Sequence, residues 1–324
     1  MHILALRGWH PELARAEVAA LGADGIDEIG ATRLVTCNSF NDEVLQAAGI
    51  ECILENGILI SIDELSLIDK WLIPRRGTTA VRVWRHEGRI EISSRYIAQY
   101  IGSLLTDSGV KIDLNSPDNT VGVILDASSG KIAIGWMRGS GPKGDDITSR
   151  QPTERPFFKP VSLDSRLART MVNLARPNSG KLIDPMCGTG GILIEASLMG
   201  VPCIGMDLDE EMVKGSRANV NWVNGDIEVI HGDATDLSTF DDISTMACDP
   251  PYGRNSWRSE NASSLIGKVI ASAIQNGVEK FAIIIPCLPN ENAETIELNG
   301  VEIIDRWVIP VHSSLNRVLI LASV

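Results

Sequence analysis

One short stretch, residues 181–196, constrains the fold more than any other part of this 324-residue sequence. It runs from a few apolar residues through a glycine-rich turn, Asp184-Pro-Met-Cys-Gly188-Thr-Gly190-Gly191, into a helical pattern. This order predicts a strand, a loop and a helix in succession. The glycines would let backbone N–H groups approach a ligand at the positive end of the helix dipole. The stretch therefore predicts a nucleotide-type binding site, although a tight turn between a strand and a helix would also use such glycines.

The spacing within the turn indicates which nucleotide-type ligand fits. A nicotinamide-binding Gly-x-Gly-x-x-Gly fingerprint would need glycine or alanine at position 193, where the sequence has leucine. Asp184 stands four positions before the first glycine and could pair with a cationic group. S-adenosylmethionine carries an ammonium at its amino-acid end, so we predict this cofactor, with Asp184, Gly188 and Gly190 among its contacts.

From residue 181 onward, strand patterns alternate with helical patterns. We expect strands at 181–183, 201–206, 228–230, 245–248 and 281–285, helices at 191–198, 210–223 and 263–276, and a terminal hairpin of 301–308 and 317–321. A helix at 163–174 precedes this series. The alternation predicts a doubly wound parallel sheet, which binds ligands beyond the carboxyl ends of its strands.

Acidic residues stand at those predicted strand ends. Asp207 lies 23 positions beyond Asp184, where a carboxylate accepts hydrogen bonds from ribose hydroxyls. Asp233 ends the next strand, where a carboxylate could accept the exocyclic N–H of adenine. Both residues are therefore candidate cofactor ligands, although a surface aspartate would be equally ordinary at either position.

The fourth strand leads into Asp249-Pro250-Pro251-Tyr252-Gly253. Two prolines fix a rigid turn and lack N–H donors, so carbonyl oxygens would face a ligand beside a carboxylate and an aromatic ring. Acceptors that hold both N–H groups of a base amine would localise its lone pair toward an electrophilic methyl carbon. This chemistry needs positioning and a proton acceptor, and we expect no metal. We predict that Asp249 and Pro250 hold the amine and that Tyr252 stacks on a base turned out of its helix.

The net charge of −13 is unevenly distributed along the chain. Residues 1–74 contain 4 basic and 12 acidic side chains, residues 75–181 contain 17 and 10, and residues 182–324 contain 8 and 20. The basic side chains of the middle region interleave with aromatic residues, which favours a polyanion partner over an ordinary solvated surface. The predicted RNA contacts are Arg75, Arg76, Arg82, Arg85, Arg138 and Lys143.

The region before residue 140 has a mixed pattern. We expect a strand at 1–6, a helix from His10 to Gly22, strands at 29–35 and 58–62, and a helix at 41–48. A second unit then has a strand at 80–84, a helix at 96–108 and a hairpin of 121–126 and 131–136. Residues 139–146 have no periodicity and are the expected linker.

Cysteine usage and apolar content limit the class of protein. The six cysteines include no Cys-x-x-Cys pair, so we expect buried free thiols, with no structural zinc and no disulfide framework. The sequence has no apolar run of membrane-spanning length and no signal-peptide pattern. We therefore expect a cytoplasmic protein that does not enter a membrane.

Three segments together resemble the archaeal tRNA (guanine-10-N2) dimethyltransferases. They are Asp184-Pro-Met-Cys-Gly-Thr-Gly-Gly, Asp249-Pro-Pro-Tyr-Gly-Arg254 and residues 155–175, which begin Arg155-Pro-Phe-Phe-Lys-Pro. The resemblance covers nearly the whole chain. The family usually has phenylalanine where Met186 stands, an apolar exchange that we do not expect to matter. Aspartate rather than asparagine at 249 favours guanine N2 over adenine N6.

The resemblance implies an organisation in four parts. Residues 1–70 would form an N-terminal ferredoxin-like region, 71–140 a THUMP domain that grips the acceptor end of tRNA, and 141–154 a linker. Residues 155–324 would form a Rossmann-like class I methyltransferase domain. Such an α/β enzyme would make N2-methyl- and N2,N2-dimethylguanosine at position 10 of tRNA, and we expect it to be a monomer.

Alternatives from other classes stay open. The nearest is a guanine-N2 methyltransferase that acts at another tRNA position or on ribosomal RNA. A DNA or protein amino-methyltransferase would leave the THUMP-like region unexplained. A catalytically inactive RNA-binding protein is disfavoured because the glycines and the Asp-Pro-Pro-Tyr segment are intact.

Overall fold

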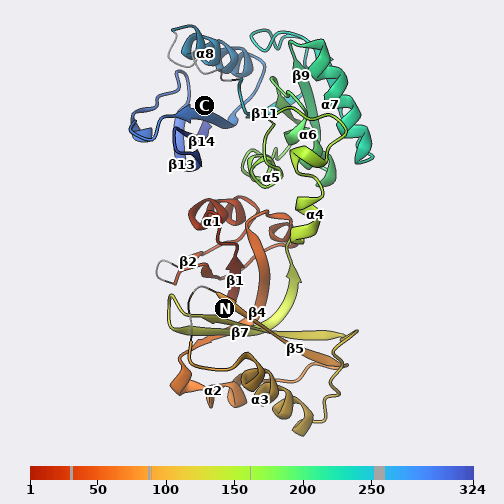
Figure 1. The fold of residues 1–324 in the computed structure, drawn as a ribbon, viewed down its shortest axis with the longest axis vertical. Helices are drawn as coiled ribbons and strands as arrows, with labels where there is room; N and C mark the ends of the chain where they lie inside the picture. The colour runs from red at the N-terminus through yellow and green to blue at the C-terminus, as the bar shows by residue number, and fades with distance from the viewer. Residues whose placement is uncertain (30–31, 87, 89, 161, 252–259) are drawn as a thin grey trace. The chain divides into compact units, whose positions relative to one another are not determined.

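The computed structural model describes residues 1–29, 32–86, 88, 90–160, 162–251 and 260–324, and the remaining residues are drawn as a grey trace in Figure 1. The chain divides into two compact units, Met1–Pro142 and Lys143–Val324. All six cysteines are free and buried, as expected from their spacing.

The first unit contains one mixed sheet. Its strands are β1 (His2–Leu6), β2 (Asp27–Glu28), β3 (Leu34–Cys37), β4 (Ile50–Ile60), β5 (Thr79–His86), β6 (Asn119–Asp126) and β7 (Lys131–Ser140). Its helices are α1 (Pro11–Ala20), α2 (Leu67–Trp71) and α3 (Ser94–Asp107), with short 3-10 turns η1 (Asp42–Gln46) and η2 (Ile62–Glu64). The strand order is β2-β3-β1-β4-β7-β6-β5, in which β5 and β6 are parallel and the other pairs are antiparallel.

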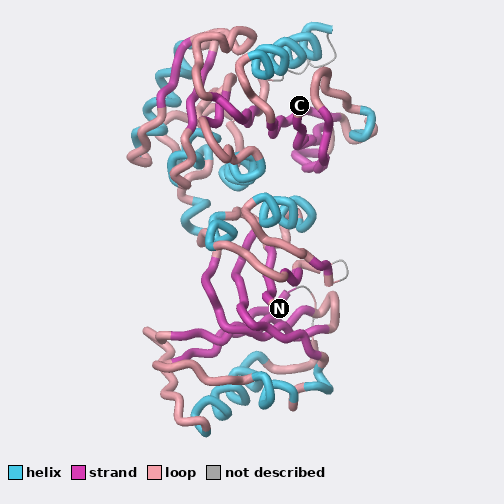
Figure 2. Tube along the Cα trace, turned by 180° about the vertical axis from the view of Figure 1, so that it is seen from behind, coloured by secondary structure: helices cyan, strands magenta, loops and turns pink. Residues whose placement is uncertain are grey.

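Apolar side chains of the helices bury against this sheet. Ile97, Ile101 and Leu105 of α3 pack with β6 and β7, and Figure 2 shows this helix lying along one face of the strands. Ala14 and Val18 of α1 pack against β1 in a separate cluster. Because β4 pairs with β7, the regions that we predicted as residues 1–70 and 71–140 share a continuous sheet. The predicted boundary near residue 70 stays a prediction.

Two strand predictions in this unit were wrong in extent. Strand β4 begins at Ile50, whereas the strand was predicted to begin at residue 58. Asn56-Gly57 is a turn signal by sequence, but in the structure these two residues form an irregularity within the strand, where the register with β7 shifts. The strand predicted at 29–35 starts only at Leu34, since the Thr32 hydroxyl accepts a hydrogen bond from the Leu34 N–H in a local turn.

The helix predicted at 41–48 and the linker predicted at 139–146 also differ from the structure. The first is the 3-10 turn η1, capped by the Asn41 side chain. The second begins inside β7, where Gly139 pairs with Ile53 of β4, and ends inside the short helix α4 (Gly144–Thr148).

The second unit contains a seven-stranded sheet. Its strands are β8 (Lys181–Asp184), β9 (Cys203–Asp207), β10 (Glu228–His231), β11 (Ile243–Cys248), β12 (Lys280–Cys287), β13 (Glu302–His312) and β14 (Leu315–Ser323). Its helices are α4, α5 (Ser165–Leu174), α6 (Gly191–Leu198), α7 (Glu210–Trp222) and α8 (Glu260–Gln275), with 3-10 turns η3 (Pro152–Glu154) and η4 (Ala293–Thr295). Helix α5 starts two residues later than predicted because the Asp164 carboxylate caps it.

The strand order in this unit is β10-β9-β8-β11-β12-β14-β13. The first five strands are parallel; β14 pairs antiparallel with β12, and β13 pairs antiparallel with β14 and so runs in the same direction as the first five. Helix α6 packs on β9, and α7 packs on β9 and β10 (Figure 1). Val269 and Ile270 of α8 bury with β11 and β12. This arrangement confirms the predicted doubly wound parallel sheet and the predicted terminal hairpin.

The connections place two strand ends side by side. From β8 the chain moves outward to β9 and β10, then returns to the other side of β8 as β11. Strands β8 and β11 therefore flank the point where the strand order reverses, which is where doubly wound sheets bind ligands. Asp184 ends β8, and Asp249 directly follows β11.

Candidate functional site

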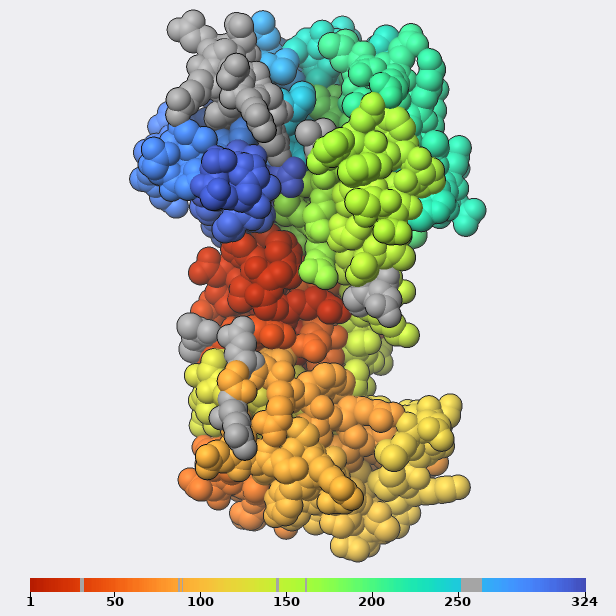
Figure 3. All heavy atoms as spheres, in the orientation of Figure 1, coloured from red at the N-terminus to blue at the C-terminus, as the bar shows by residue number. Residues whose placement is uncertain are grey.

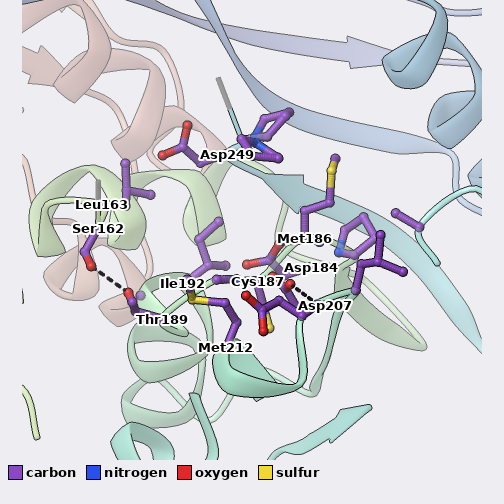
Figure 4. A pocket seen from close by; sticks show the side chains of 18 of the residues that line it. Ser162, Leu163, Asp184, Met186, Cys187, Thr189, Ile192, Asp207, Met212 and Asp249 are labelled. Atoms are coloured by element: carbon purple, nitrogen blue, oxygen red, sulfur yellow. Dashed lines mark hydrogen bonds between the residues drawn. The ribbon is translucent and has the colours of Figure 1, made fainter. Parts of the chain in front are cut away.

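A cavity of about 860 Å³ opens at the carboxyl ends of these strands. Its lining includes Asp184, Asp207, Asp233 and Asp249. Figure 4 shows the first, second and fourth of these side chains around the same cavity. Its volume is typical of sites that hold a small ligand or cofactor. The residues predicted from four separate strands are thus brought to one place.

The glycine loop has the backbone that its sequence requires. Gly188 and Gly190 have φ angles of 51° and 78°, in the left-handed region that favours glycine. Gly188 lines the cavity, with open space where a side chain would stand. Gly190, the N-cap of α6, is not among the described lining residues, and a Cβ there would lie 2.4 Å from Ser216 Oγ. Gly190 therefore serves close packing, and a direct cofactor contact through it stays a prediction.

Asp184 is the most buried carboxylate of the cavity, with 2% of its surface exposed. Burial raises the pKa of this carboxyl well above its usual range, and the negative charges of Asp207 and Asp249 raise it further. The Met186 N–H, 3.4 Å from Asp184 Oδ1, acts in the opposite direction. A buried carboxylate with acidic neighbours favours a cationic ligand, because a positive charge would offset both effects.

Asp207 and Asp233 lie in more polar surroundings. Asp207 ends β9 and accepts hydrogen bonds from the backbone N–H groups of Gly188 (2.7 Å) and Asp209 (2.9 Å), so it connects the glycine loop to the next turn. Asp233 is exposed beyond β10 and accepts from the Thr235 N–H at 2.9 Å and from its hydroxyl at 2.8 Å. These two hydrogen bonds lower the pKa of Asp233. Both carboxylates are suited to accept hydrogen bonds from a polar ligand.

The segment after β11 supplies a carboxylate and a proline turn. The Asp249 side chain is 13% exposed, and Pro250 and Pro251 line the cavity beside it. The Asp249 carboxylate lies 3.5 Å from the Arg317 guanidinium. Tyr252, predicted to stack on a base, lies outside the described residues.

Sequence reasoning did not assign the apolar and hydroxyl groups of the lining. Ser162 and Leu163, which precede α5, form one wall, and the Thr189 hydroxyl donates to Ser162 Oγ at 2.9 Å (Figure 4). Other lining residues missed by that reasoning are Ile192, Leu208, Met212 and Leu265. The only signal for the first wall was the resemblance of residues 155–175 to a known family, which gave no position in space.

A buried asparagine joins that wall to the glycine loop. Asn219 of α7 is fully buried; its side chain donates to the backbone oxygens of Phe157 (2.8 Å) and Thr189 (2.9 Å) and accepts from the Phe157 N–H (2.8 Å). A Cβ on Gly215 would lie 2.1 Å from the Phe157 ring, so α7 and this segment are in close contact. We call Asn219 and the groups it holds the asparagine clamp.

A buried carboxylate of α6 holds the same region through two arginines. Glu195 of α6 has no exposed surface and accepts hydrogen bonds from Arg150 and from Arg169, each at 2.9 Å. Arg155, 5% exposed, donates to the Leu163 carbonyl at 3.1 Å. Burial lowers the pKa of Arg155 to about 10. These pairs fix the helix that begins at the glycine loop to the segment that precedes α5.

The predicted RNA-contacting residues are largely engaged within the protein. Arg75 pairs with Glu55 at 3.2 Å and lies over the Trp136 ring, and Arg138 pairs with Asp42 at 2.7 Å. Arg82 donates to the Leu114 carbonyl, and Arg85 donates to the Ser94 hydroxyl and to backbone carbonyls. Arg76 and Lys143 are exposed. The assignment of these six residues to RNA stays a prediction.

Among the described residues, no group of three or more histidine, cysteine, aspartate or glutamate side chains could hold a metal ion. Within that part of the chain, every helix is too short or too polar to cross a membrane.

The chain is similar to proteins of known name over almost its full length. Residues 152–288 match the family model described as RMKL-like, methyltransferase domain. The tRNA (guanine(10)-N2)-dimethyltransferase of Methanothermobacter thermautotrophicus is 32% identical, over 96% of this chain and 95% of the relative. The protein of the same name from Pyrococcus abyssi is also 32% identical, over 98% of each chain. Among solved structures, TrmN from Thermus thermophilus shares the fold with a TM-score of 0.53 and 20% identity, covering 100% of this chain and 99% of that one.

Proposed function

Because the chain belongs to the family of the tRNA (guanine(10)-N2)-dimethyltransferases, we propose that it methylates the exocyclic N2 of guanosine 10 in tRNA. The methyl donor is S-adenosylmethionine, and the products are N2-methyl- and N2,N2-dimethylguanosine. One observation supports this function above the others: Asp249 and Pro250 line the same cavity as Asp184, from the strand next to it. The hydrogen-bond acceptors for the target amine are thus next to the cofactor site.

The carboxylates of the cavity suit the polar groups of S-adenosylmethionine. Asp184 would pair with the ammonium of its amino-acid end, Asp207 would accept hydrogen bonds from the ribose hydroxyls, and Asp233 would accept one from the adenine amine. Leu208, which is 68% exposed and lines the cavity, offers apolar surface for the adenine ring. When bound, the cofactor would supply an electrophilic methyl carbon.

The residues after β11 would hold the target amine. The Asp249 carboxylate and the Pro250 carbonyl each accept one N–H of guanine N2, which localises the nitrogen lone pair. S-adenosylmethionine would supply the methyl carbon, and Asp249 would accept the proton that the amine nitrogen loses when it is methylated. Tyr252 would stack on the base, which must leave its helix to reach the cavity. The protein contributes positioning and a proton acceptor.

The other parts of the chain extend this proposal. We assign residues 1–70 to a ferredoxin-like region, 71–140 to a THUMP domain that binds tRNA, 141–154 to a linker and 155–324 to the methyltransferase domain. Six basic side chains would contribute positive charge toward phosphates. They are the exposed Arg76 and Lys143 and the partly paired Arg75, Arg82, Arg85 and Arg138. We further propose that the protein acts as a cytoplasmic monomer.

Mass spectrometry of tRNA nucleosides tests the proposed function. The full chain is incubated with isotope-labelled S-adenosylmethionine and unmodified tRNA, and we expect labelled N2-methyl- and N2,N2-dimethylguanosine. A tRNA with adenosine at position 10 should accept no label. Label at another guanosine, or on ribosomal RNA alone, would replace the proposed position by one of the alternatives.

The variant Asp249→Ala tests the assigned proton acceptor. We expect methyl transfer to fall by at least about 10²-fold while S-adenosylmethionine affinity, measured by calorimetry, stays within about threefold. Asp241, exposed and outside the cavity lining, provides the matched control Asp241→Ala, which should behave like the wild type. Equal loss of transfer and cofactor affinity in Asp249→Ala would show that the residue is misassigned.

A further inference from the structure

Arg317 of β14 contacts the proposed proton acceptor. Its Nη2 lies 3.5 Å from Asp249 Oδ2, and the two side chains are only 14% and 13% exposed. Arg317 stands opposite Pro286 near the carboxyl end of β12, which lies between β14 and β11. The side chain therefore reaches across the end of β12 to the residue that follows β11.

This pairing differs from that of Arg306, an arginine within the neighbouring strand β13. Arg306 of β13 pairs with Glu294 at 3.3 Å and donates to the Ile296 carbonyl, and none of these residues lines the cavity. Strand β13 forms the edge of the sheet, and the terminal hairpin lies at the surface of its unit (Figure 3). Arg306 therefore supports the hairpin, whereas Arg317 is directed toward a carboxylate of the cavity.

The charges of the cavity explain what a cation at this position can do. Asp184, Asp207, Asp233 and Asp249 line one space, and the described lining contains no lysine or arginine. Neighbouring negative charges disfavour the ionised form of a carboxyl group, whereas a guanidinium within about 4 Å favours it. A hydrogen bond to one carboxylate oxygen also fixes the plane of the group, and thus the direction in which it accepts a proton.

We propose that Arg317 is a positioning residue for methyl transfer: it holds the Asp249 carboxylate ionised and oriented toward the amine of the target guanine. This role rests on the proposed function, because it acts through Asp249. It needs no contact between Arg317 and the RNA or the cofactor. Arg317 therefore affects the transfer step and leaves both binding steps nearly unchanged.

The test compares Arg317→Met with Arg317→Lys in the full chain. Displacing a reacting group by about 1 Å can cost on the order of 10²-fold in rate, so we expect a fall of this size in kcat for Arg317→Met. S-adenosylmethionine affinity and the KM for tRNA should stay within about threefold. Arg317→Lys keeps the charge and should restore at least about tenfold of the lost rate. The matched control Arg306→Met should keep the wild-type kcat.

A double-mutant cycle shows whether Arg317 acts through Asp249. In an Asp249→Asn background, adding Arg317→Met should cost less than about threefold more, because the carboxylate on which the guanidinium acts is already replaced by a neutral amide. A wild-type kcat for Arg317→Met, or full additivity with Asp249→Asn, would refute the role. A raised KM for tRNA with unchanged kcat would instead identify Arg317 as an RNA contact. If the wild-type chain methylates no tRNA, the proposed function fails, and the role of Arg317 fails with it.

Discussion

At the scale of single residues, the cavity places one chemical group in contrasting environments. Asp184 is buried among other carboxylates, and its pKa is raised, whereas Asp233 is exposed and hydrogen-bonded to Thr235, and its pKa is lowered. Asp233 is therefore ready to accept a hydrogen bond over a wide pH range. The ionised form of Asp184 is disfavoured in the absence of a bound cation, so its contribution to cofactor binding should depend on pH.

Replacing Asp184 by asparagine should change stability and binding in opposite directions. Between the ordinary carboxyl pKa and the raised one, the folded protein keeps a proton that the unfolded chain has lost. Its stability therefore falls as the pH rises through this interval, by up to about 1.4 kcal/mol for each pH unit. Asp184→Asn cannot titrate, so without cofactor it should gain stability over the wild type as the pH rises.

Thermal denaturation of the two proteins at several pH values measures this difference, and calorimetry measures binding. We expect Asp184→Asn to bind S-adenosylmethionine more weakly, because the ammonium loses its partner. The wild-type affinity should rise with pH across the interval in which Asp184 ionises, and that dependence should be absent from the variant. Parallel stability curves for the two proteins would show that Asp184 does not titrate differently in the folded state.

At the scale of elements, the asparagine clamp joins three segments that are distant in sequence. Asn219 lies in α7, Thr189 in the glycine loop, and Phe157 in the segment before α5. That segment continues into Ser162 and Leu163, which form a wall of the cavity. Asn219 thus helps to set the position of this wall relative to the glycine loop, together with the Thr189–Ser162 hydrogen bond.

Asn219→Ala should loosen the wall as well as destabilise the fold. Removing the amide leaves buried backbone groups without their partner, which costs about 1–3 kcal/mol in unfolding free energy. We expect weaker S-adenosylmethionine binding, since the bridge that Asn219 makes between Phe157 and Thr189 is lost. Asn221 is exposed on the same helix, so Asn221→Ala is the matched control and should leave both quantities unchanged. Denaturant unfolding and calorimetry of both variants test the prediction.

Elements and residues with local sequence signals could be predicted, whereas long-range contacts could not. The strands of the second unit and the aspartates at their ends could be predicted, because apolar runs and the residues that follow them are local signals. The predicted strand at 58–62 covered only the end of β4, since an Asn-Gly pair is a turn signal by sequence and here forms an irregularity within the strand. The partners Asn219 and Arg317 had no local signal, because their roles depend on contacts with residues 62 and 68 positions away.

At the scale of the whole molecule, charge is divided between and within the two units. In the first unit, residues 1–74 contain 4 basic and 12 acidic side chains, whereas residues 75–142 contain 9 and 6. Some of these charges neutralise one another, as Arg75 does with Glu55 and Arg138 with Asp42. The positive charge available for the proposed tRNA contacts is therefore smaller than the sequence suggests, and tRNA affinity should depend on several exposed groups together.

The division into units predicts that cofactor binding and tRNA binding can be separated. The described residues that line the cavity all belong to Lys143–Val324, which has its own apolar core. A fragment of these residues should therefore fold and bind S-adenosylmethionine with an affinity within about threefold of the full chain. If the first unit binds tRNA, the fragment should lose at least about tenfold in tRNA affinity, and the dependence of binding on salt should become shallower, since fewer phosphates are neutralised. Calorimetry and filter binding over a salt series measure these quantities. A fragment that bound tRNA as tightly as the full chain would place the RNA contacts on the second unit and remove the role proposed for residues 71–140.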